Sequence, residues 1–426
     1  YLMFIHVVNP GENLWTISNR YRVPIDPIVQ VNEISDPGRL VPGQALVIPS
    51  VSTFHTVGPG DTLWSVSQRY SVPLADLLSA NNLQITDIIY PGQAIRLPQR
   101  PRPVIDVNAY IYLLGQQAAP IVRSVGRYLT YLSPFAYLIR EDGSLQPIDD
   151  TPAIQAAYET GTAPMMAITN FTATSRGENL ASVVLNNPQT VQRLLDNIVG
   201  KMRQKGYLGL NIDFENVLPA DREAYNNFLR QAVNRLHREG YFVSTAVAPK
   251  ISGEQTGLLY EAHDYAAHGR IVDFVILMTY EWGWRTGPPQ PISPINEIRR
   301  VLYYAVTQIP RNKIFFGFQI YARDWIVPHM RGMEAETFSN QEAIMRAIRY
   351  GAVIRFDPVS QSPFFRYVDE QGRRHEVWFE DARSAQAKFN LVKEYGLGGI
   401  SYWALGYPYP QNWALLNDNF IIRKLL

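Results

Sequence analysis

The sequence predicts an α/β protein, namely a (β/α)8 TIM barrel preceded by two small βααβ modules. Three observations predict it. A segment of about fifty residues occurs twice at the N-terminal end, a proline-rich stretch follows it, and eight strand signals then alternate with helix signals to the end of the chain. Such alternation is typical of a parallel sheet whose strands are joined by helices. An open doubly wound sheet is the alternative.

Composition limits the classes of function. The 426 residues are 46% apolar and 18% charged, as in an ordinary globular protein. A net charge of +1 argues against nucleic acid or an anionic membrane as partner. The absence of cysteine excludes disulfides and thiolate metal sites. No apolar run approaches the ~18–20 residues of a membrane span, and no cleavable signal peptide is visible at Tyr1. The oligomeric state is left open.

The N-terminal repeat consists of two copies of one pattern. The matching segments are His6–Trp15 with His55–Trp64, Arg20–Pro24 with Arg69–Pro73, Asn32 with Asn81, and Pro42–Ala45 with Pro91–Ala94. In the first copy we expect a strand over 5–8, a helix capped by Asn13, a second helix over 27–32 and a strand over 45–48. Six aromatic and histidine side chains are interpreted as structural or core residues: Trp15, Trp64, Tyr21, Tyr70, His6 and His55.

These motifs resemble the LysM domain, which binds the N-acetylglucosamine backbone of peptidoglycan and chitin. The resemblance implies one LysM module over 1–50, a second over 51–98, and a linker over 99–103. In the family, the glycan lies between the loop after the first strand and the loop before the last. The glycan-binding residues implied here are Gly11, Glu12, Asn13, Leu14 and Ile34 in the first module, and Gly60, Asp61, Thr62, Leu63 and Leu83 in the second.

The barrel is expected over 104–426. Its strand candidates are residues 105–112, 131–139, 165–170, 209–214, 242–248, 274–279, 314–320 and 399–403. Among the intervening helices, one is capped by Asn187 and stops before Gly206, and another starts after Asp221. A small α+β insertion is expected over about 326–380, between the seventh and eighth strands, with a hairpin over 364–379. No glycine-rich loop opens a helix, which argues against nucleotide chemistry.

The fourth strand carries an unusual row of polar residues. Leu210, Ile212 and Phe214 alternate with Asn211, Asp213 and Glu215. A period of two places the polar set on one face of the strand. Carboxylates on a buried strand are costly without partners or a task, and barrel enzymes keep their chemistry at the C-terminal ends of the strands. A half-exposed strand with a polar face is the alternative.

This strand resembles the active-site strand of glycoside hydrolase family 18, Asp-Gly-x-Asp-x-Asp-x-Glu. Asp213 and Glu215 match the pattern, whereas Leu208 and Asn211 stand where the family usually has Asp. Other motifs match on the later strands in the correct order: Met278–Glu281 on the sixth, Tyr321–Trp325 after the seventh, and Trp403 at the end of the eighth. The resemblance covers about 104–426.

The resemblance implies a substrate-assisted reaction, in which the acetamide of the sugar is the nucleophile. Glu215 would be the acid, Asp213 would orient the acetamide, Tyr280 would hold its oxygen, and Asn211 would hydrogen-bond Asp213. The residues expected to bind sugar are Trp403, Glu281, Asn170, Trp282, Gln319 and Asp324, with Trp284 and Trp378 as further candidates. His263, Asp264 and His268 are interpreted as structural. No metal and no cofactor are expected.

Two LysM modules ahead of a family 18 barrel resemble the bacterial spore peptidoglycan hydrolases, the cortical-fragment-lytic or spore-germination N-acetylglucosaminidases. The resemblance implies a retaining N-acetylglucosaminidase that hydrolyses spore-cortex peptidoglycan and is associated with the spore or the cell wall. A chitinase acting on N-acetylglucosamine polymers is one alternative. A non-catalytic, lectin-like glycan binder is the other.

Overall fold

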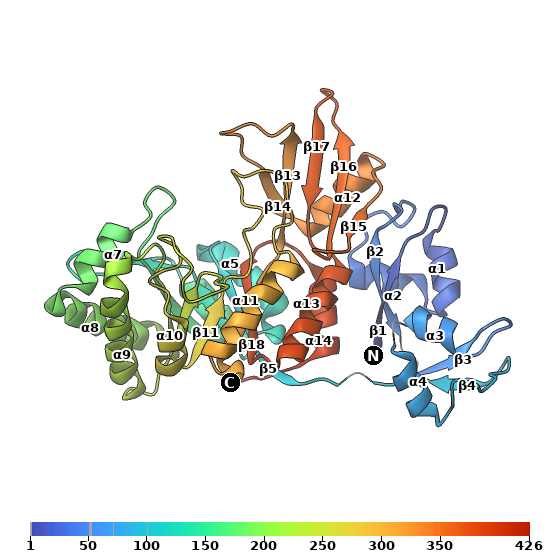
Figure 1. Cartoon of the computed structure of the whole chain (residues 1–426), viewed down its shortest axis with the longest axis horizontal. Coiled ribbons are helices and arrows are strands. Elements are labelled where there is room, and N and C mark those ends of the chain that lie inside the picture. Colours follow the sequence, from blue (N-terminus) through green and yellow to red (C-terminus); the bar gives the residue numbers. More distant parts are fainter. Residues whose placement is uncertain (1, 51–52, 71, 100) are drawn as a thin grey trace.

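A computed structural model describes residues 2–50, 53–70, 72–99 and 101–426. Figure 1 shows a barrel ringed by helices, an upright β-sheet above it, and the two N-terminal modules on the opposite side from helices α7–α9. The first N-terminal module lies next to the upright sheet, and the second module lies farther from it.

Eight parallel strands close into a barrel. Their order around the barrel is β5 (Val104–Ile111), β6 (Tyr131–Pro134), β8 (Ala163–Thr169), β9 (Gly209–Asp213), β10 (Phe242–Val247), β11 (Phe274–Leu277), β12 (Ile314–Gln319) and β18 (Gly399–Leu405). Pairing of β18 with β5 closes the ring. Two short strands, β7 (Tyr137–Leu138) and β19 (Ile421–Ile422), pair with β8 and β5. The predicted TIM barrel is therefore confirmed, and the open doubly wound alternative is wrong.

Helices cover the outside of the barrel. They are α5 (Ala118–Val125), α6 (Thr151–Glu159), α7 (Glu178–Leu185), α8 (Pro188–Lys205), α9 (Arg222–His237), α10 (Tyr265–Ile271), α11 (Ile295–Gln308), α13 (Ala382–Tyr395) and α14 (Pro410–Asn419). The side chain of Asn187 accepts hydrogen bonds from the first turn of α8, and Gly206 ends the helix with a φ of 80°. Both helix signals read from the sequence are confirmed, because α9 also starts directly after Asp221.

The barrel core has two layers. Leu210, Ile212 and Phe214 pack outward against the helices, whereas the interior of the barrel holds a separate cluster that includes Phe274 and Phe315, with ring centroids 4.1 Å apart. These rings lie near the N-terminal ends of the strands. They fill that end of the barrel and leave the C-terminal end for polar side chains.

The insertion forms its own antiparallel sheet. Its elements are β13 (Tyr321–Val327), β14 (Glu336–Ser339), α12 (Asn340–Arg349), β15 (Arg355–Asp357), β16 (Ser362–Val368) and β17 (Arg374–Trp378). The strand order is β14-β13-β17-β16-β15. The hairpin expected over 364–379 is present as β16 and β17. Because β13 follows β12 almost directly, the insertion stands at the C-terminal end of the barrel (Figure 1).

Each N-terminal module has the predicted βααβ order. The first comprises β1 (Leu2–Val7), α1 (Leu14–Tyr21), α2 (Ile25–Asn32) and β2 (Ala45–Ser50); the second comprises β3 (Phe54–Thr56), α3 (Leu63–Tyr70), α4 (Leu74–Asn81) and β4 (Ala94–Arg96). The side chain of Asn13 caps α1 by accepting a hydrogen bond from the backbone N–H of Thr16, at 2.9 Å. The modules share one apolar core, in which Phe4 of the first packs on Tyr70 of the second.

The interpretation of Trp15 and Trp64 as core residues is wrong. Their exposed fractions are 67% and 64%. Leu14 and Ile17 form the buried face of α1, and Trp15 lies one residue beyond Leu14, about 100° around the helix axis. Each tryptophan therefore projects from its module into solvent.

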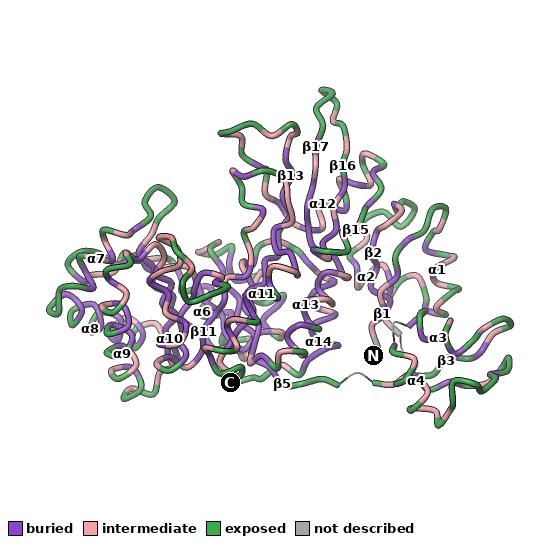
Figure 2. The backbone as a smooth tube through the Cα atoms, in the orientation of Figure 1, coloured by how far each residue is buried: buried purple, intermediate pink, exposed green. Residues whose placement is uncertain are grey.

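Figure 2 shows that the buried backbone is concentrated in the barrel and at the base of the insertion. The C-terminal end and the loops of the second module are mostly exposed. Within the described ranges, no helix has both the length and the apolar content needed to cross a membrane.

Candidate active site

The polar residues at the end of β9 face the barrel interior. Asn211 and Asp213 are buried. The Asn211 Oδ1 accepts a hydrogen bond from the Tyr110 hydroxyl at 2.7 Å, and its Nδ2 donates to Ser244 Oγ at 2.9 Å. Tyr110 lies on β5 and Ser244 on β10, so the Asn211 amide is held between two other strands of the barrel. The alternation predicted from the sequence is confirmed.

The predicted hydrogen bond from Asn211 to Asp213 is wrong. The Asn211 amide is engaged by Tyr110 and Ser244 instead. The Asp213 Oδ1 is buried and has no hydrogen-bond partner among the described residues. A buried carboxylate oxygen without a donor is costly, so Asp213 holds an acceptor that a bound molecule can satisfy.

Both carboxyl groups of the site bind a proton more tightly than usual. Burial, followed by the negative charge of Glu281, raises the pKa of Glu215 from 4.5 to about 7. Burial, followed by the charge of Glu215, holds the pKa of Asp213 well above its usual range. Near neutral pH, a substantial fraction of Glu215 is therefore protonated, as a general acid must be.

Asn170 supports the backbone of Glu215. Its Oδ1 accepts a hydrogen bond from the Glu215 N–H at 2.9 Å, and its Nδ2 donates to the Glu215 carbonyl at 2.7 Å and to the Gly177 carbonyl at 3.1 Å. The side chain is only 1% exposed. Asn170 was predicted to bind sugar, but its amide is already used to fix the segment that carries Glu215.

Tyr280 and Trp403 lie where their motifs predict, after β11 and on β18. Burial, together with the charges of Asp213 and Glu215, raises the pKa of the Tyr280 phenol far above its usual value, so the hydroxyl remains a donor. Trp403 contacts Phe135 and Tyr110, with ring centroids 4.9 and 5.4 Å apart. An aromatic cluster is thus present beside the carboxyl groups.

Glu281 is held by two residues of the insertion that the sequence-based list of candidates omits. Arg323 forms an ion pair with it at 3.0 Å, and the Tyr321 hydroxyl donates to its Oε1. Arg323 also donates to the Gly283 carbonyl at 2.7 Å. A signal was present, because both residues belong to the Tyr321–Trp325 motif.

Asp324 was predicted to line the cleft, and this is wrong. Its carboxylate lies inside the insertion, where it pairs with Arg346 at 2.7 Å and with His375 at 2.6 Å and accepts a hydrogen bond from Tyr367. Successive side chains of a strand point to opposite faces. Since Arg323 faces Glu281, Asp324 faces the other side of β13.

Gln319 is the last residue of β12, and Trp282 lies in the loop that follows the neighbouring strand β11. Gln319 is fully buried and donates to Glu380 at 2.9 Å, while its Oε1 lacks a partner among the described residues. The backbone of Trp282 is tied to the Ile292 carbonyl, and its ring is partly buried. Trp284 is 53% exposed, and Trp378 stacks on Phe364 within the insertion. Their sugar contacts stay predictions.

The two buried histidines near β10 have backbone and hydroxyl partners. His263 bonds the Phe214 carbonyl at 2.8 Å and accepts from the Ala248 N–H at 2.9 Å, and burial lowers its pKa to about 4. His268 bonds Thr245 at 3.0 Å, and Asp264 caps α10. These contacts agree with a structural role. Across the described ranges, no cluster of three or more His, Asp or Glu side chains could hold a metal ion.

In the N-terminal modules, the two acidic residues predicted to bind glycan are part of internal networks. Glu12 pairs with His6 at 2.8 Å and Asp61 pairs with His55 at 2.8 Å. Each carboxylate also accepts a backbone N–H of the turn before it. Asn13 and Thr62 begin the following helices, where Leu14 and Leu63 are buried. The N–H groups of Ile34 and Leu83 donate to the carbonyls of Val29 and Leu78. The glycan contacts predicted for Gly11, Gly60, Ile34 and Leu83 stay predictions.

Comparison with known protein families identifies the family to which this chain belongs. The profile of glycosyl hydrolases family 18 matches residues 132–407. The chain belongs to glycosyl hydrolase family 18. It is therefore a glycosidase, and the LysM domain profile matches residues 6–49 and 55–98 ahead of the barrel.

Several relatives are similar over the whole chain. The cortical fragment-lytic enzyme of Bacillus subtilis (strain 168) is 52% identical over 427 residues, which cover 99% of each chain. The crystal structure of the Bacillus cereus spore cortex-lytic enzyme SleL superposes with a TM-score of 0.90 at 41% identity and covers 100% of this chain and 99% of its own. A chitinase structure from Chromobacterium violaceum has a TM-score of 0.68 at 25% identity and covers 75% of this chain and 100% of its own.

Proposed function

We propose that the protein is a retaining, substrate-assisted N-acetylglucosaminidase that hydrolyses spore-cortex peptidoglycan. One observation carries the mechanism: Glu215, whose pKa is raised to about 7, lies close in the chain to Asp213, whose buried Oδ1 has no donor among the described residues. The pair combines a proton donor with an acceptor for a substrate N–H. Both are needed when the acetamide of the substrate is the nucleophile.

In the first step, protonated Glu215 donates its proton to the glycosidic oxygen. The acetamide oxygen attacks C1 as the bond from C1 to the leaving oxygen breaks, and an oxazolinium ion forms. Asp213 accepts the acetamide N–H and balances the developing positive charge. Tyr280, which keeps its proton, donates to the acetamide oxygen and orients it for attack.

In the second step, the Glu215 carboxylate takes a proton from water, and the water attacks C1. The oxazolinium opens, the acetamide is restored, and Glu215 is again protonated. Two displacements at C1 retain the configuration of the sugar. Asn170 acts on both steps by holding the Glu215 backbone in position.

The choice of substrate rests on the relatives and on the LysM modules. The B. subtilis relative named a cortical fragment-lytic enzyme is 52% identical and matches the full length, including both modules. We therefore assign the LysM region, residues 1–98, to glycan binding, residues 104–426 to hydrolysis, and the protein to the spore cortex or the cell wall. A glycan-binding module on the same chain raises the effective concentration of the catalytic domain at an insoluble glycan.

Mass analysis of digested cortex tests the proposal. The expected result is fragments that carry N-acetylglucosamine at the reducing end, released by the unmodified chain and not by Glu215→Gln. Release from chitin oligomers alone would establish the chitinase alternative, which the similarity to the C. violaceum chitinase favours. Equal activity of Glu215→Gln would overturn the assignment of Glu215.

A further inference from the structure

The first LysM module is docked on the catalytic domain through the loop before β2. Gln341 of α12 donates to the carbonyl oxygens of Asn32 and Glu33, at 3.1 and 3.3 Å. Gln411 of α14 donates to Asn32 Oδ1 and to the Ala45 carbonyl, both at 2.8 Å. Gln411 is buried. The loop that begins at Asn32 is thus bonded to both the insertion and the barrel.

The C-terminal end of this loop contacts both the insertion and the barrel helix α13. The Ile354 N–H donates to the Pro42 carbonyl at 3.0 Å, and Arg383 donates to the Gly43 carbonyl at 2.9 Å. Val41 is 5% exposed and belongs to the apolar cluster of the insertion. The two ends of the loop, Asn32–Glu33 and Val41–Gly43, therefore contact the insertion and the barrel, while residues 35–39 between them are exposed.

The equivalent loop of the second module has different surroundings. The repeat aligns Asn32 with Asn81, so Tyr90 occupies the position of Val41. Tyr90 is 65% exposed, and Ile85 and Ile88 are 73% and 71% exposed. Apolar side chains gathered on an exposed loop indicate an interaction surface.

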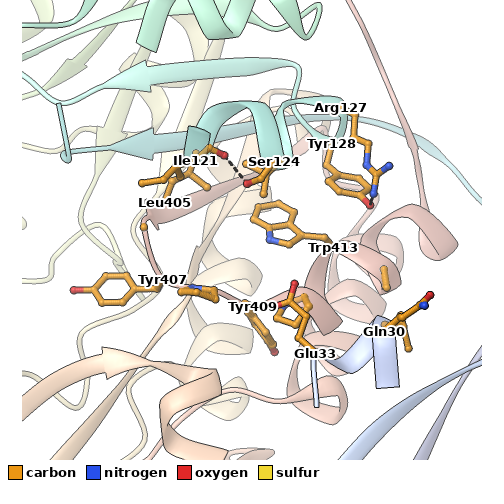
Figure 3. A pocket seen from close by; sticks show the side chains of 16 residues that line it. Gln30, Glu33, Ile121, Ser124, Arg127, Tyr128, Leu405, Tyr407, Tyr409 and Trp413 are labelled. Atoms are coloured by element: carbon orange, nitrogen blue, oxygen red, sulfur yellow. Dashed lines mark hydrogen bonds between the residues drawn. The ribbon is translucent and has the colours of Figure 1, made fainter. Parts of the chain in front are cut away.

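The first module also lies against the flank of the barrel. A cavity of about 430 Å³ lies between α2 of that module and helices α5 and α14. Figure 3 shows Gln30 and Glu33 at its edge and Tyr128, Tyr409 and Trp413 on the barrel side. Helix α14 also packs against β1 and β2. The first module thus contacts the barrel as well as the insertion.

The insertion connects this interface to the active site. Its first strand, β13, carries Tyr321 and Arg323, which hold Glu281. The charge of Glu281 in turn helps to raise the pKa of Glu215. A shift of the insertion would move Glu281 relative to the acid.

We propose that the first LysM module is a fixed brace that holds the insertion beside the cleft, and that the second module alone offers its loop, Leu83 to Tyr90, to a glycan strand. The glycan as occupant rests on the proposed function. The exposed Ile85, Ile88 and Tyr90 side chains of this loop suit the apolar ring faces of N-acetylglucosamine.

Two glycines provide a matched test of the brace. Gly43 and Gly92 occupy equivalent turns with φ of 84° and 89°, so alanine is equally strained at either position. A Cβ on Gly43 would lie 1.7 Å from the Ile354 carbonyl oxygen, whereas a Cβ on Gly92 meets nothing within 4 Å. Only Gly43→Ala wedges a module away from the insertion.

We expect Gly43→Ala in the full chain to lower kcat/KM on soluble N-acetylglucosamine oligomers at least tenfold, and Gly92→Ala to lower it less than twofold. Near-ultraviolet circular dichroism checks that both variants are folded at the assay temperature. Equal losses in the two variants would overturn the brace. So would full activity of Gly43→Ala.

Hydrogen exchange tests which module binds glycan. The probe is an N-acetylglucosamine pentamer added to the full-length Glu215→Gln chain, which binds without cleavage. We expect the pentamer to slow exchange over 81–90 and to leave exchange over 32–41 the same as in the ligand-free chain. Slowing over both loops, or over 32–41 alone, would overturn the division between the modules.

The same experiments separate this inference from the proposed function. If the unmodified chain cleaves cortex but exchange over 81–90 does not change with the pentamer, the inference fails and the function stands. If the unmodified chain cleaves no N-acetylglucosamine glycan at all, the proposed function fails, whatever the exchange pattern is.

Discussion

Replacement of Glu281 by glutamine tests the electrostatics of the candidate active site. A general acid works while it is protonated, so activity should be present at low pH and lost as the pH rises through the pKa of Glu215, about 7. Glu281→Gln removes a negative charge near Glu215 and leaves Arg323 without its counter-charge. Both changes favour the Glu215 carboxylate and lower its pKa, so the alkaline limb of the pH–rate profile should move to lower pH.

The size of the shift can be bounded. The pKa of Glu215 is raised from 4.5 to about 7, and burial contributes more of this rise than Glu281 does. The charge of Glu281 therefore contributes less than half of this rise in the pKa of Glu215, or about one pH unit. The Glu281 side chain is 42% exposed, which screens its charge. We expect a shift of about 0.3 to 1 pH unit.

The assay is the pH dependence of kcat/KM, which reports the free enzyme. Tyr321→Phe is the matched control, because it removes a neutral hydrogen bond to the same carboxylate and leaves the charge in place. It should shift the limb by less than half as much as Glu281→Gln does. A limb that stays in place, or moves to higher pH, in Glu281→Gln would refute the reasoning.

Three further predictions concern single residues. Glu215→Gln should lower kcat by about 10³-fold or more. A carboxyl with a raised folded-state pKa makes the unmodified chain less stable as the pH rises from 4.5 to 7, and the variant lacks this loss. The unfolding free energy of Glu215→Gln relative to the unmodified chain should therefore be higher at pH 8 than at pH 4, by up to about 3 kcal/mol. Thermal unfolding at the two pH values measures this, and an equal difference at both would contradict it. Asn170→Leu removes three hydrogen bonds and should lower the unfolding free energy by about 2–4 kcal/mol. It should also lower kcat about 10-fold or more with little change in KM. A rise in KM alone would instead support a sugar-binding role for Asn170. Asp324→Ala leaves the buried Arg346 without one of its partners; it should destabilise the chain by about 3 kcal/mol in urea unfolding and leave KM within about twofold, and a large rise in KM without loss of stability would return Asp324 to the cleft.

The local patterns of the sequence were enough to predict the barrel. A period of two along Gly209–Glu215 placed Asp213 and Glu215 on one face, and the strand buries Leu210 and Ile212 on the other, as predicted. Asn187 and Gly206 marked the ends of α8, because cap geometry depends on residues only a few positions apart. The same period, applied to Tyr321–Trp325, would have selected Arg323 over Asp324.

The partners of polar side chains could not be predicted in this way. Asn211 meets Tyr110, 101 residues away in the chain, and Asn170 meets Glu215, 45 residues away. Spacing indicates which way a side chain points, but it does not indicate which donor another strand brings to it. For this reason, the hydrogen bond from Asn211 to Asp213 and the sugar contact of Asp324 were wrong.

By itself, the sequence determined the order of strands and helices, the two βααβ modules, and the face of β9 that carries Asp213 and Glu215, because these follow from periodicity and caps within one element. Only the tertiary structure decided that Asn170 clamps Glu215 and that Arg323 holds Glu281. It also decided that the end of the loop before the last strand is covered in the first module, at Val41, and exposed in the second, at Tyr90. The repeat has nearly the same residues at Pro42–Gly43 and Pro91–Gly92. Their difference lies in Ile354, more than three hundred residues away in the chain, which packs on Gly43 and leaves Gly92 uncovered.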